Sequence, residues 1–357
     1  MPISGSMNTG PILAFVDCEN DASAGGGSGH VQAHGRREVV ISGKRVKTVD
    51  VHAHCIVPEA AQLINHSLEA PGLLWSNIGD RLAQMDQTGV DVQALSINPY
   101  WYRAERDAVA ELIRVQNEAL AEFCASQQDR FVAFATAALQ YPDLAAEQVE
   151  QAVKTFGFRG IGVGGSVAGE DLANPKFHPF WSKCEELGVL VFMHPLGTRE
   201  LEPSGRLAGN GLLTNTIGNP LETTIALSHL IFEGTLDRFP GLKICASHGG
   251  GFLPSYANRS DAVITTFPDR VGPLPKKKPT EYIRGGQLYF DSIMFTGEGM
   301  RHLIAEAGID HVVLGTDYPF PWNTAPVDHV MSIPGLSDED RIKILGGTAA
   351  KLLGIEG

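Results

Sequence analysis

Two histidines stand one residue apart in the segment Thr48–Cys55, which reads T-V-D-V-H-A-H-C. His52 and His54 alternate with the apolar residues Val51 and Ala53, so an extended chain directs both imidazoles to one face. A neutral imidazole is the commonest metal ligand among side chains, and two on one face would form half of a metal site. The spacing alone leaves open an ordinary strand that ends in two histidines without a ligand role.

Three further residues with metal-binding side chains each end an apolar run later in the chain. His194 ends V-L-V-F-M-H, His248 ends I-C-A-S-H, and Asp317 ends V-V-L-G-T-D. If these runs are parallel strands of one barrel, their carboxyl ends meet at a single rim, where barrel enzymes build their active sites. Imidazoles and a carboxylate suit zinc or a similar divalent ion. Together with the first two histidines, they predict a catalytic metal site.

Short apolar runs that alternate with amphipathic stretches would have to position these residues. This alternation predicts a parallel sheet covered by helices, and eight such units favour a closed (β/α)8 TIM barrel. The alternative is an open doubly wound sheet. However, no G-x-G-x-x-G follows the first run, and the glycines of Gly160–Gly165 are more consistent with close packing or a tight turn. The predicted strands are Val49–His54, Val92–Ile97, Phe131–Ala137, Gly160–Val163, Val189–His194, Lys243–His248, Leu288–Ile293 and Val312–Asp317. The predicted helices include Gly79–Thr88, Asp107–Ser126, Leu144–Phe156, Phe177–Leu187, Glu222–Arg238, Gly299–Ala307 and Asp338–Leu353.

The chain divides into an N-terminal arm and one domain. Residues 1–36 are rich in Gly, Ser and Ala, a composition that predicts a flexible arm without a fold of its own. Residues 37–47 read R-E-V-V-I-S-G-K-R-V-K and predict a β-hairpin about a Ser-Gly turn. The barrel domain is therefore expected to span residues 37–357 and to begin with this hairpin.

Charge and cysteine content narrow the classes of partner and compartment. The net charge of −13 disfavours nucleic acid and anionic membrane surfaces as partners. The 5 cysteines are scattered and include no C-x-x-C pair, which favours reduced thiols and a cytoplasmic location. No basic region precedes the apolar residues 11–16, so we expect neither a signal peptide nor a membrane span.

Several motifs in combination resemble the amidohydrolase superfamily, specifically its aminocarboxymuconate-semialdehyde decarboxylase branch. The motifs are V-D-V-H-A-H, F-M-H-P, N-P-L-E-T-T, F-P-G-L-K-I-C-A-S-H-G-G-G and L-G-T-D-Y-P-F-P, and the resemblance spans residues 48–354. It implies that one divalent ion, zinc or manganese, is bound by four residues: His52, His54, His194 and Asp317. It further implies that His248 is the acid/base residue and acts in catalysis together with Asp317. No lysine ends the fourth predicted strand, where two-metal members of the superfamily carry a bridging lysine, so a single metal is expected.

The same resemblance suggests residues that bind the substrate. Arg81, in R-x-x-x-M-D, matches a position that binds a substrate carboxylate, and Arg259 matches an arginine that reaches the neighbouring subunit's site in a homodimer. A guanidinium grips a carboxylate with two parallel hydrogen bonds, but each arginine could instead form an ordinary surface ion pair. Aromatic residues after the predicted strands, Trp101 and Phe320 among them, suit a planar conjugated substrate. Other aromatic residues in these positions are Tyr100, Tyr102, Phe295, Tyr318 and Trp322.

These features predict a metal-dependent, non-oxidative decarboxylase of an aromatic or muconate-type carboxylic acid. The alternative is a hydrolase or hydratase that uses the same metal site, and release of carbon dioxide would separate the two. A metal-binding protein without turnover is a third possibility, but such a protein would not need an acid/base histidine beside an open coordination position. Leu196, which stands where relatives carry Trp, and the short segment from Cys55 to Trp75 put the identity of the substrate in doubt.

Overall fold

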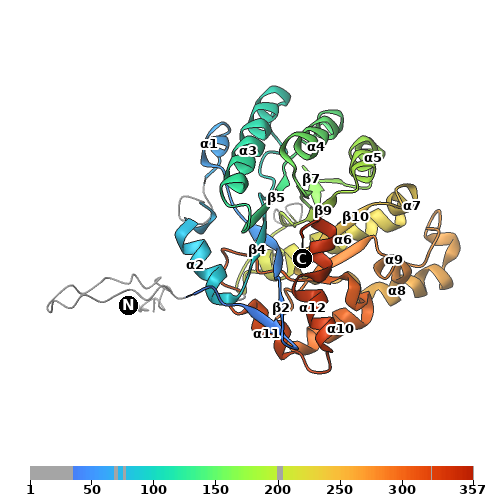
Figure 1. The fold of residues 1–357 in the computed structure, drawn as a ribbon. Coiled ribbons are helices and arrows are strands. Elements are labelled where there is room, and N and C mark those ends of the chain that lie inside the picture. Colours follow the sequence, from blue (N-terminus) through green and yellow to red (C-terminus); the bar gives the residue numbers. More distant parts are fainter. Residues whose placement is uncertain (1–34, 68–70, 75–77, 199–203, 323, 357) are drawn as a thin grey trace, which may run out of the picture. The chain divides into compact units, whose positions relative to one another are not determined.

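The computed structural model describes residues 35–67, 71–74, 78–198, 204–322 and 324–356. Within them, eight strands form one sheet in which every neighbouring pair is parallel. Helices surround this sheet on its outside (Figure 1). The predicted (β/α)8 barrel is confirmed. In sheet order, the strands are β3 (Val49–His54), β4 (Val92–Ser96), β5 (Phe131–Ala135), β6 (Gly160–Val163), β9 (Leu190–Met193), β10 (Lys243–Ala246), β11 (Leu288–Asp291) and β12 (Val312–Val313).

The helices that follow the strands begin and end at recognisable residues. In α4, Pro142 occupies the first turn, where its missing N–H costs nothing, and Gly157 ends the helix in the left-handed conformation with φ +69°. Gly188 ends α5 in the same way with φ +64°. The helices are α1 (Pro58–Gln62), α2 (Ile78–Thr88), α3 (Arg106–Ser126), α4 (Pro142–Phe156), α5 (His178–Leu187), α6 (Asn219–Phe232), α7 (Thr235–Arg238), α8 (Leu253–Thr266), α9 (Pro279–Ile283), α10 (Gly297–Ala307), α11 (Pro326–Ser332), α12 (Asp338–Ile342) and α13 (Thr348–Leu353).

The sheet closes between its first and last strands. Backbone hydrogen bonds run from Val51 N to Leu314 O at 2.9 Å, from Asp317 N to His52 O at 2.8 Å and from His54 N to Tyr318 O at 2.7 Å. The extended residues after β12 therefore continue along β3. Closure of the barrel takes place at the same residues from which the candidate ligands project.

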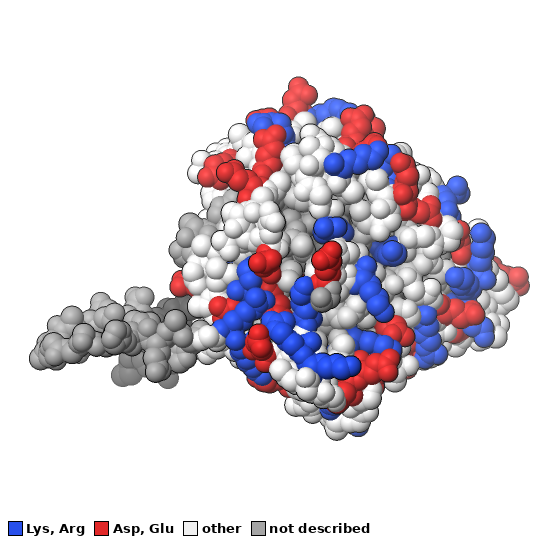
Figure 2. Space-filling model, viewed as in Figure 1, with Lys and Arg blue, Asp and Glu red and all other residues white. Residues whose placement is uncertain are grey.

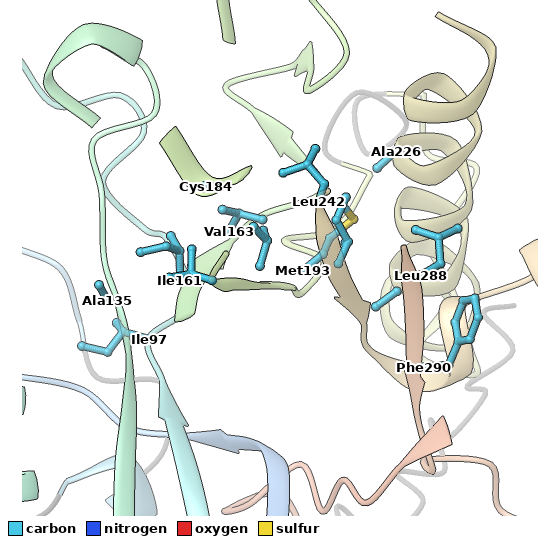
Figure 3. Packing of buried hydrophobic residues seen from close by; sticks show 14 of the residues in the cluster. Ile97, Ala135, Ile161, Val163, Cys184, Met193, Ala226, Leu242, Leu288 and Phe290 are labelled. Atoms are coloured by element: carbon cyan, nitrogen blue, oxygen red, sulfur yellow. The ribbon is translucent and has the colours of Figure 1, made fainter. Parts of the chain in front are cut away.

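Alternating strand residues fill two separate cores. One cluster of buried residues lies inside the barrel and includes Leu190 and Phe192 of β9, with Leu353 of α13. The alternate residues Val191 and Met193 belong to the larger cluster between the strands and the helices. Figure 3 shows Met193 in this larger cluster, with Ile161 and Val163 of β6, Leu288 and Phe290 of β11, and Ala226 of α6. This alternation holds the strands rigidly, which fixes the side chains at their carboxyl ends.

Gly160 is the first residue of β6 and belongs to the glycine run that was predicted to allow close packing. It makes room inside the barrel. A Cβ on Gly160 would lie 2.4 Å from Leu190 O and 2.7 Å from Phe134 Cδ1. The ring of Phe134 stacks on that of Phe192 with centroids 5.4 Å apart. Glycine at this position therefore serves packing, as predicted, and not the binding of a dinucleotide.

The predicted N-terminal hairpin is present. Strands β1 (Val39–Ile41) and β2 (Lys44–Val46) pair antiparallel about Ser42 and Gly43, which both have positive φ. Arg45 holds the hairpin to the barrel through two hydrogen bonds to the carboxylate of Asp91, at 2.8 and 3.1 Å. The predicted arm, residues 1–36, lies outside the described residues except for its last two.

Several element boundaries differ from the prediction. The strands that begin at Phe131, Lys243 and Leu288 each end two residues earlier than predicted, and β12 ends four residues earlier, at Val313. The helix predicted over Glu222–Arg238 is divided into α6 and α7 at Gly234, which has φ +77°. The helix predicted over Asp338–Leu353 contains the π-helical segment Lys343–Gly347, named η8, between α12 and α13. Arg259 lies on α8, a helix that is not among the ranges given above.

Surface charge is mixed in sign. Figure 2 shows basic and acidic side chains interspersed on the face viewed in Figure 1. In the described part of the chain, no helix is both long and apolar enough to cross a membrane. The cysteines that the structure describes, Cys55, Cys124, Cys184 and Cys245, are all free. Cys18, the fifth cysteine, lies outside the described residues.

Candidate metal centre and its pocket

The five predicted site residues meet at the carboxyl end of the barrel. His52 Nε2 lies 3.0 Å from His54 Nε2 and 3.1 Å from Asp317 Oδ1. The ring of His194 lies 4.6 Å from that of His54 and 5.1 Å from that of His248, measured between centroids. Residues up to 265 positions apart in the sequence, His52 and Asp317, are thus in contact, as the barrel template predicted.

Two overlapping sets of four ligands can be drawn from these five residues. One nitrogen or oxygen atom from each of His52, His194, His248 and Asp317 lies within 4.8 Å of the other three. The set expected from the sequence has His54 in place of His248, and His54 Nε2 is 3.0 Å from Asp317 Oδ1. Three members are therefore common to both sets.

Outer hydrogen bonds orient two of the imidazoles. His52 Nδ1 is 2.6 Å from Asp291 Oδ2, and His54 Nδ1 is 3.1 Å from Ser96 Oγ. Each contact leaves the Nε2 atom directed into the cluster. Nδ1 of His194 is buried and has no hydrogen-bond partner within the described residues. Because a buried polar atom without a partner is costly, this nitrogen fits a ligand that the protein itself does not supply.

Burial and charge separate the pKa values of the imidazoles. Burial lowers the pKa of His54 to about 4 and brings the pKa of His194 well below its usual range. Burial also acts to lower the pKa of His52, but the carboxylates of Asp317 and Asp291 outweigh it and raise that pKa to about 10. Burial opposes ionisation of Asp317, yet His52 and the hydrogen-bonded histidines hold the pKa of this carboxyl far below its ordinary value. His54 and His194 are thus kept neutral beside an ionised carboxylate. Once His52 gives up a proton as a cation binds, the donor set fits a divalent ion.

His248 differs from the other histidines in exposure and in backbone conformation. Its side chain is 19% exposed, whereas those of His52 and His54 are 0% and 1% exposed. The backbone of His248 has φ +53°, and that of Asp317 has φ +62°. A left-handed conformation in residues other than glycine costs energy and is concentrated at functional sites. Both residues are thus held in unusual conformations where the strands meet the pocket.

The cluster forms the floor of an open pocket. Two adjoining hollows, of about 240 and 310 Å³, share five wall residues, among them His248 and Asp317. The aromatic residues Tyr100, Phe320 and Trp322 line the first hollow, and Phe295 and Trp322 line the second. Among the described residues, no lysine or arginine lines either hollow. Besides the cluster itself, polar side chains in the walls include His66, Asn98, Asn215, Thr216 and Asn219.

Arg81 and Trp101 lie away from this pocket. Arg81 is 2% exposed, donates to His54 O at 2.6 Å and to Gln93 Oε1 at 3.1 Å, and lies over the ring of Tyr318. Trp101 is fully buried and its Nε1 donates to Ala137 O at 3.0 Å. Neither lines a hollow, so the geometry gives no support to the substrate-binding roles predicted for them. Their positions are explained by packing, because each satisfies its polar atoms inside the protein.

The other two predicted substrate-binding residues lie in different surroundings. Phe320 lines the pocket beside the cluster, and its ring is 6.0 Å from that of His54. Arg259 is exposed on α8 and does not line the pocket of its own chain. This location is compatible with the predicted role across a dimer interface, which stays a prediction.

Two residues near the site were not singled out from the sequence. Asp291, the last residue of β11, is hydrogen-bonded to His52. Like the proposed ligands, it follows an apolar run, L-Y-F, at the carboxyl end of a strand, so the same pattern could have indicated it. Asn98, two residues after β4, lines the pocket, and its buried Oδ1 has no partner within the described residues. An amide after a strand is too common a pattern to have indicated Asn98.

Comparison with known proteins agrees with this geometry. A family model described as Amidohydrolase matches residues 49–355. The chain is 30% identical over 279 residues to 2-amino-3-carboxymuconate-6-semialdehyde decarboxylase of Dictyostelium discoideum, an alignment that covers 77% of this chain and 76% of that protein. It is also 30% identical over 335 residues to gamma-resorcylate decarboxylase of Rhizobium sp., which covers 87% of this chain and 98% of the relative.

A solved structure shares the fold as well. Dihydroxybenzoic acid decarboxylase of Polaromonas sp., determined with bound manganese and the inhibitor 2-nitroresorcinol, is 26% identical and has a TM-score of 0.73. The match covers 87% of this chain and 97% of that one. By its family match and by these relatives, the chain belongs to the amidohydrolase family, in the branch that contains the aminocarboxymuconate-semialdehyde and gamma-resorcylate decarboxylases.

Proposed function

We propose that this protein is a metal-dependent, non-oxidative decarboxylase of an aromatic or muconate-type carboxylic acid. The observation that carries the proposal is that a partly exposed histidine, His248, lies in the wall of a pocket lined by aromatic residues. His248 faces both hollows, and its Nε2 is 3.6 Å from Asp317 Oδ2. The decarboxylases named above support the choice of reaction.

His52, His54, His194 and Asp317 are the proposed ligands of one divalent ion. When bound, the ion supplies a positive charge that holds an anionic substrate and stabilises developing negative charge. The three imidazoles suit zinc and the carboxylate also suits manganese, and the manganese in the related Polaromonas structure supports the second of these. Asn98 and Asn219 offer neutral hydrogen-bond groups for the rest of the polar edge of the substrate.

His248 is the proposed proton donor. In the protonated form, its imidazolium transfers a proton to the carbon that bears the carboxylate, which makes that carbon tetrahedral. The carbon–carbon bond then breaks, carbon dioxide leaves, and the electron pair returns to the conjugated system. Tyr100, Phe320 and Trp322 form flat walls that hold the conjugated plane in position for this transfer. His248 then recovers its proton from solvent, since its side chain is partly exposed.

The test is a turnover screen of the protein reconstituted separately with zinc and with manganese. The panel comprises hydroxybenzoates, carboxymuconate semialdehydes and related aryl carboxylic acids, with evolved carbon dioxide as the readout. We expect release from at least one acid, and loss of release after treatment with a chelator and its return when metal is added back. If no acid releases carbon dioxide, the decarboxylase assignment is wrong.

The second candidate is a hydrolase or hydratase that uses the same cluster. Its support is the open pocket above the metal cluster, which leaves room for water as well as substrate. The same screen separates it from the decarboxylase, because a product formed without release of carbon dioxide indicates addition of water.

We also propose that the protein forms a homodimer and is located in the cytoplasm. The homodimer is tested below, and fluorescence microscopy of the tagged full-length chain in its host cell tests the location.

A further inference from the structure

We propose that Asp291 is a positioning residue that sets both the tautomer of His52 and the backbone of His248. One carboxylate would then couple a metal ligand to the proton donor. This inference rests on the metal site and on the role of His248 in the proposed function. Asp291 itself faces neither hollow, so it is not a catalytic residue.

Asp291 is fully buried at the end of β11, and both of its carboxylate oxygens are used. Oδ2 lies 2.6 Å from His52 Nδ1 and accepts from His248 N at 2.9 Å. Oδ1 accepts from Gly249 N at 2.9 Å and from Ile293 N at 3.1 Å. Four hydrogen bonds therefore converge on one ionised group, whose pKa His52 keeps below its usual value although burial alone would raise it.

The first consequence concerns His52. A carboxylate can only accept a hydrogen bond, so the contact at 2.6 Å requires a proton on Nδ1 of His52. In the neutral imidazole, the lone pair is then on Nε2, which lies 3.0 Å from His54 Nε2 and 3.1 Å from Asp317 Oδ1. Asp291 thus presents the metal-binding nitrogen of His52 to the cluster. A carboxylate behind a ligating histidine also raises the basicity of that ligand.

The second consequence concerns the backbone that carries His248. His248 and Gly249 are both left-handed, with φ +53° and +62°. This conformation turns two successive N–H groups toward the same side, and both donate to Asp291. A Cβ on Gly249 would lie 2.6 Å from Met294 Sδ, so the turn is also packed closely. Asp291 therefore offsets the cost of an unusual conformation that directs His248 into the pocket.

Asp50 provides a matched control. It too is fully buried, on β3, which β12 separates from β11, and it accepts four hydrogen bonds at 2.7–3.1 Å. Its donors are His52 N, Gln93 Nε2, Thr316 N and Thr316 Oγ1. No imidazole nitrogen is among them. Substitution of Asp50 thus removes a comparable buried carboxylate and leaves the tautomer of His52 untouched.

The experiment compares Asp291→Asn with Asp50→Asn in the full chain. Asparagine at position 291 carries no negative charge behind His52 and keeps only one accepting oxygen. Its NH₂ group faces either the donors of His52 and His248 or those of Gly249 and Ile293. We expect zinc and manganese to bind Asp291→Asn 10–100-fold more weakly than the wild type, the range typical of partners behind a metal ligand. Asp50→Asn should lose thermal stability to a similar extent but keep near wild-type metal affinity. Affinity is measured by competition with a chelating dye, without any carboxylic acid present.

The tautomer is read directly by ¹H–¹⁵N correlation of the histidine rings in the zinc-loaded protein. We expect the ring proton of His52 on Nδ1 in the wild type and in Asp50→Asn, and a changed pattern in Asp291→Asn. A wild-type His52 with its proton on Nε2, or unchanged metal affinity in Asp291→Asn, would overturn the proposal. The wild-type measurement decides the matter even if Asp291→Asn does not fold. Because neither readout requires turnover, a failed decarboxylation screen leaves this test intact.

Discussion

At the scale of single residues, the site divides its histidines by exposure. His52, His54 and His194 are buried against carboxylates and rings, while His248 alone is substantially open to the pocket. A buried imidazole binds a cation through a nitrogen that carries no proton. A partly exposed imidazole can exchange protons with solvent, as a general acid must in every turnover.

Replacing His248 with Ala is therefore expected to reduce kcat by about 10²–10⁴, the usual contribution of general acid catalysis. Metal content should be retained, because the four proposed ligands remain. Carbon dioxide release and metal analysis of the purified variant check the two parts. Near-normal activity would remove His248 from the mechanism. Loss of the metal would instead indicate that His248 is itself a metal ligand, since one of its ring nitrogens lies within 4.8 Å of ligand atoms of His52, His194 and Asp317.

Replacing Arg81 with Met is expected to destabilise the fold. It would leave His54 O and Gln93 Oε1 without their buried donor, at a cost of about 1–3 kcal/mol in the free energy of unfolding. Arg301→Met on exposed α10, where the arginine pairs with Glu298, is the control and should change stability little. Urea unfolding and KM are measured together. A raised KM with unchanged stability would instead support the carboxylate-binding role predicted for Arg81.

The sequence could predict the site residues because strand ends obey a simple rule. His194, His248 and Asp317 each follow an apolar run, and parallel strands bring such ends together. The surroundings of Arg81 could not be predicted in this way. Whether its guanidinium points into the pocket or under it depends on the packing of Gln93, in β4, and of Tyr318, which follows β12. Local pattern carries no information about such contacts.

At the scale of elements, the boundaries depend on contacts that a single sequence does not reveal. The amphipathic run Asp338–Leu353 predicts one continuous helix, but its middle is the π-helical segment η8. There, Gly346 lies against β3, and a Cβ on it would be 2.0 Å from Lys47 O. The close approach of the two backbones explains why glycine is needed at this position. It also places the C-terminal helices directly against the strand that carries two of the proposed ligands.

Gly346→Ala should consequently destabilise the protein, by roughly 1–3 kcal/mol or more, because the strand or the helix must shift. Gly79→Ala in α2 is the matched substitution, since a Cβ there meets nothing within 4 Å. That change should be neutral or stabilise by up to about 1 kcal/mol. Chemical denaturation of both variants gives the comparison. Equal effects at the two positions would show that the contact with Lys47 is readily accommodated.

At the scale of the whole molecule, the pocket of one chain contains no guanidinium among its described wall residues. Arg259, exposed on α8, was predicted to serve a neighbouring subunit. A second chain would then complete the charge balance around an anionic substrate. The sequence could suggest this arrangement only through family resemblance, because no pattern within one chain identifies the surface on which its partner lies.

We expect sedimentation to show a homodimer and Arg259→Ala to lose most of its activity. Mixing Arg259→Ala with His248→Ala subunits, by unfolding and refolding together, should restore activity. In a mixed dimer, the subunit with intact His248 receives Arg259 from its partner. Refolding each variant alone is the control and should restore nothing. Full activity of a monomer, or no recovery on mixing, would contradict the shared site.

The hydrogen bonds that close the barrel join Asp317 to His52 and His54 to Tyr318. Completion of the fold and assembly of the ion-binding cradle are thus one event. During synthesis on the ribosome, the histidines of the first strand emerge more than 260 residues before the carboxylate that faces them. Capture of the cation would therefore report that the last strand has docked, and a nascent chain could not begin chemistry before its architecture was finished.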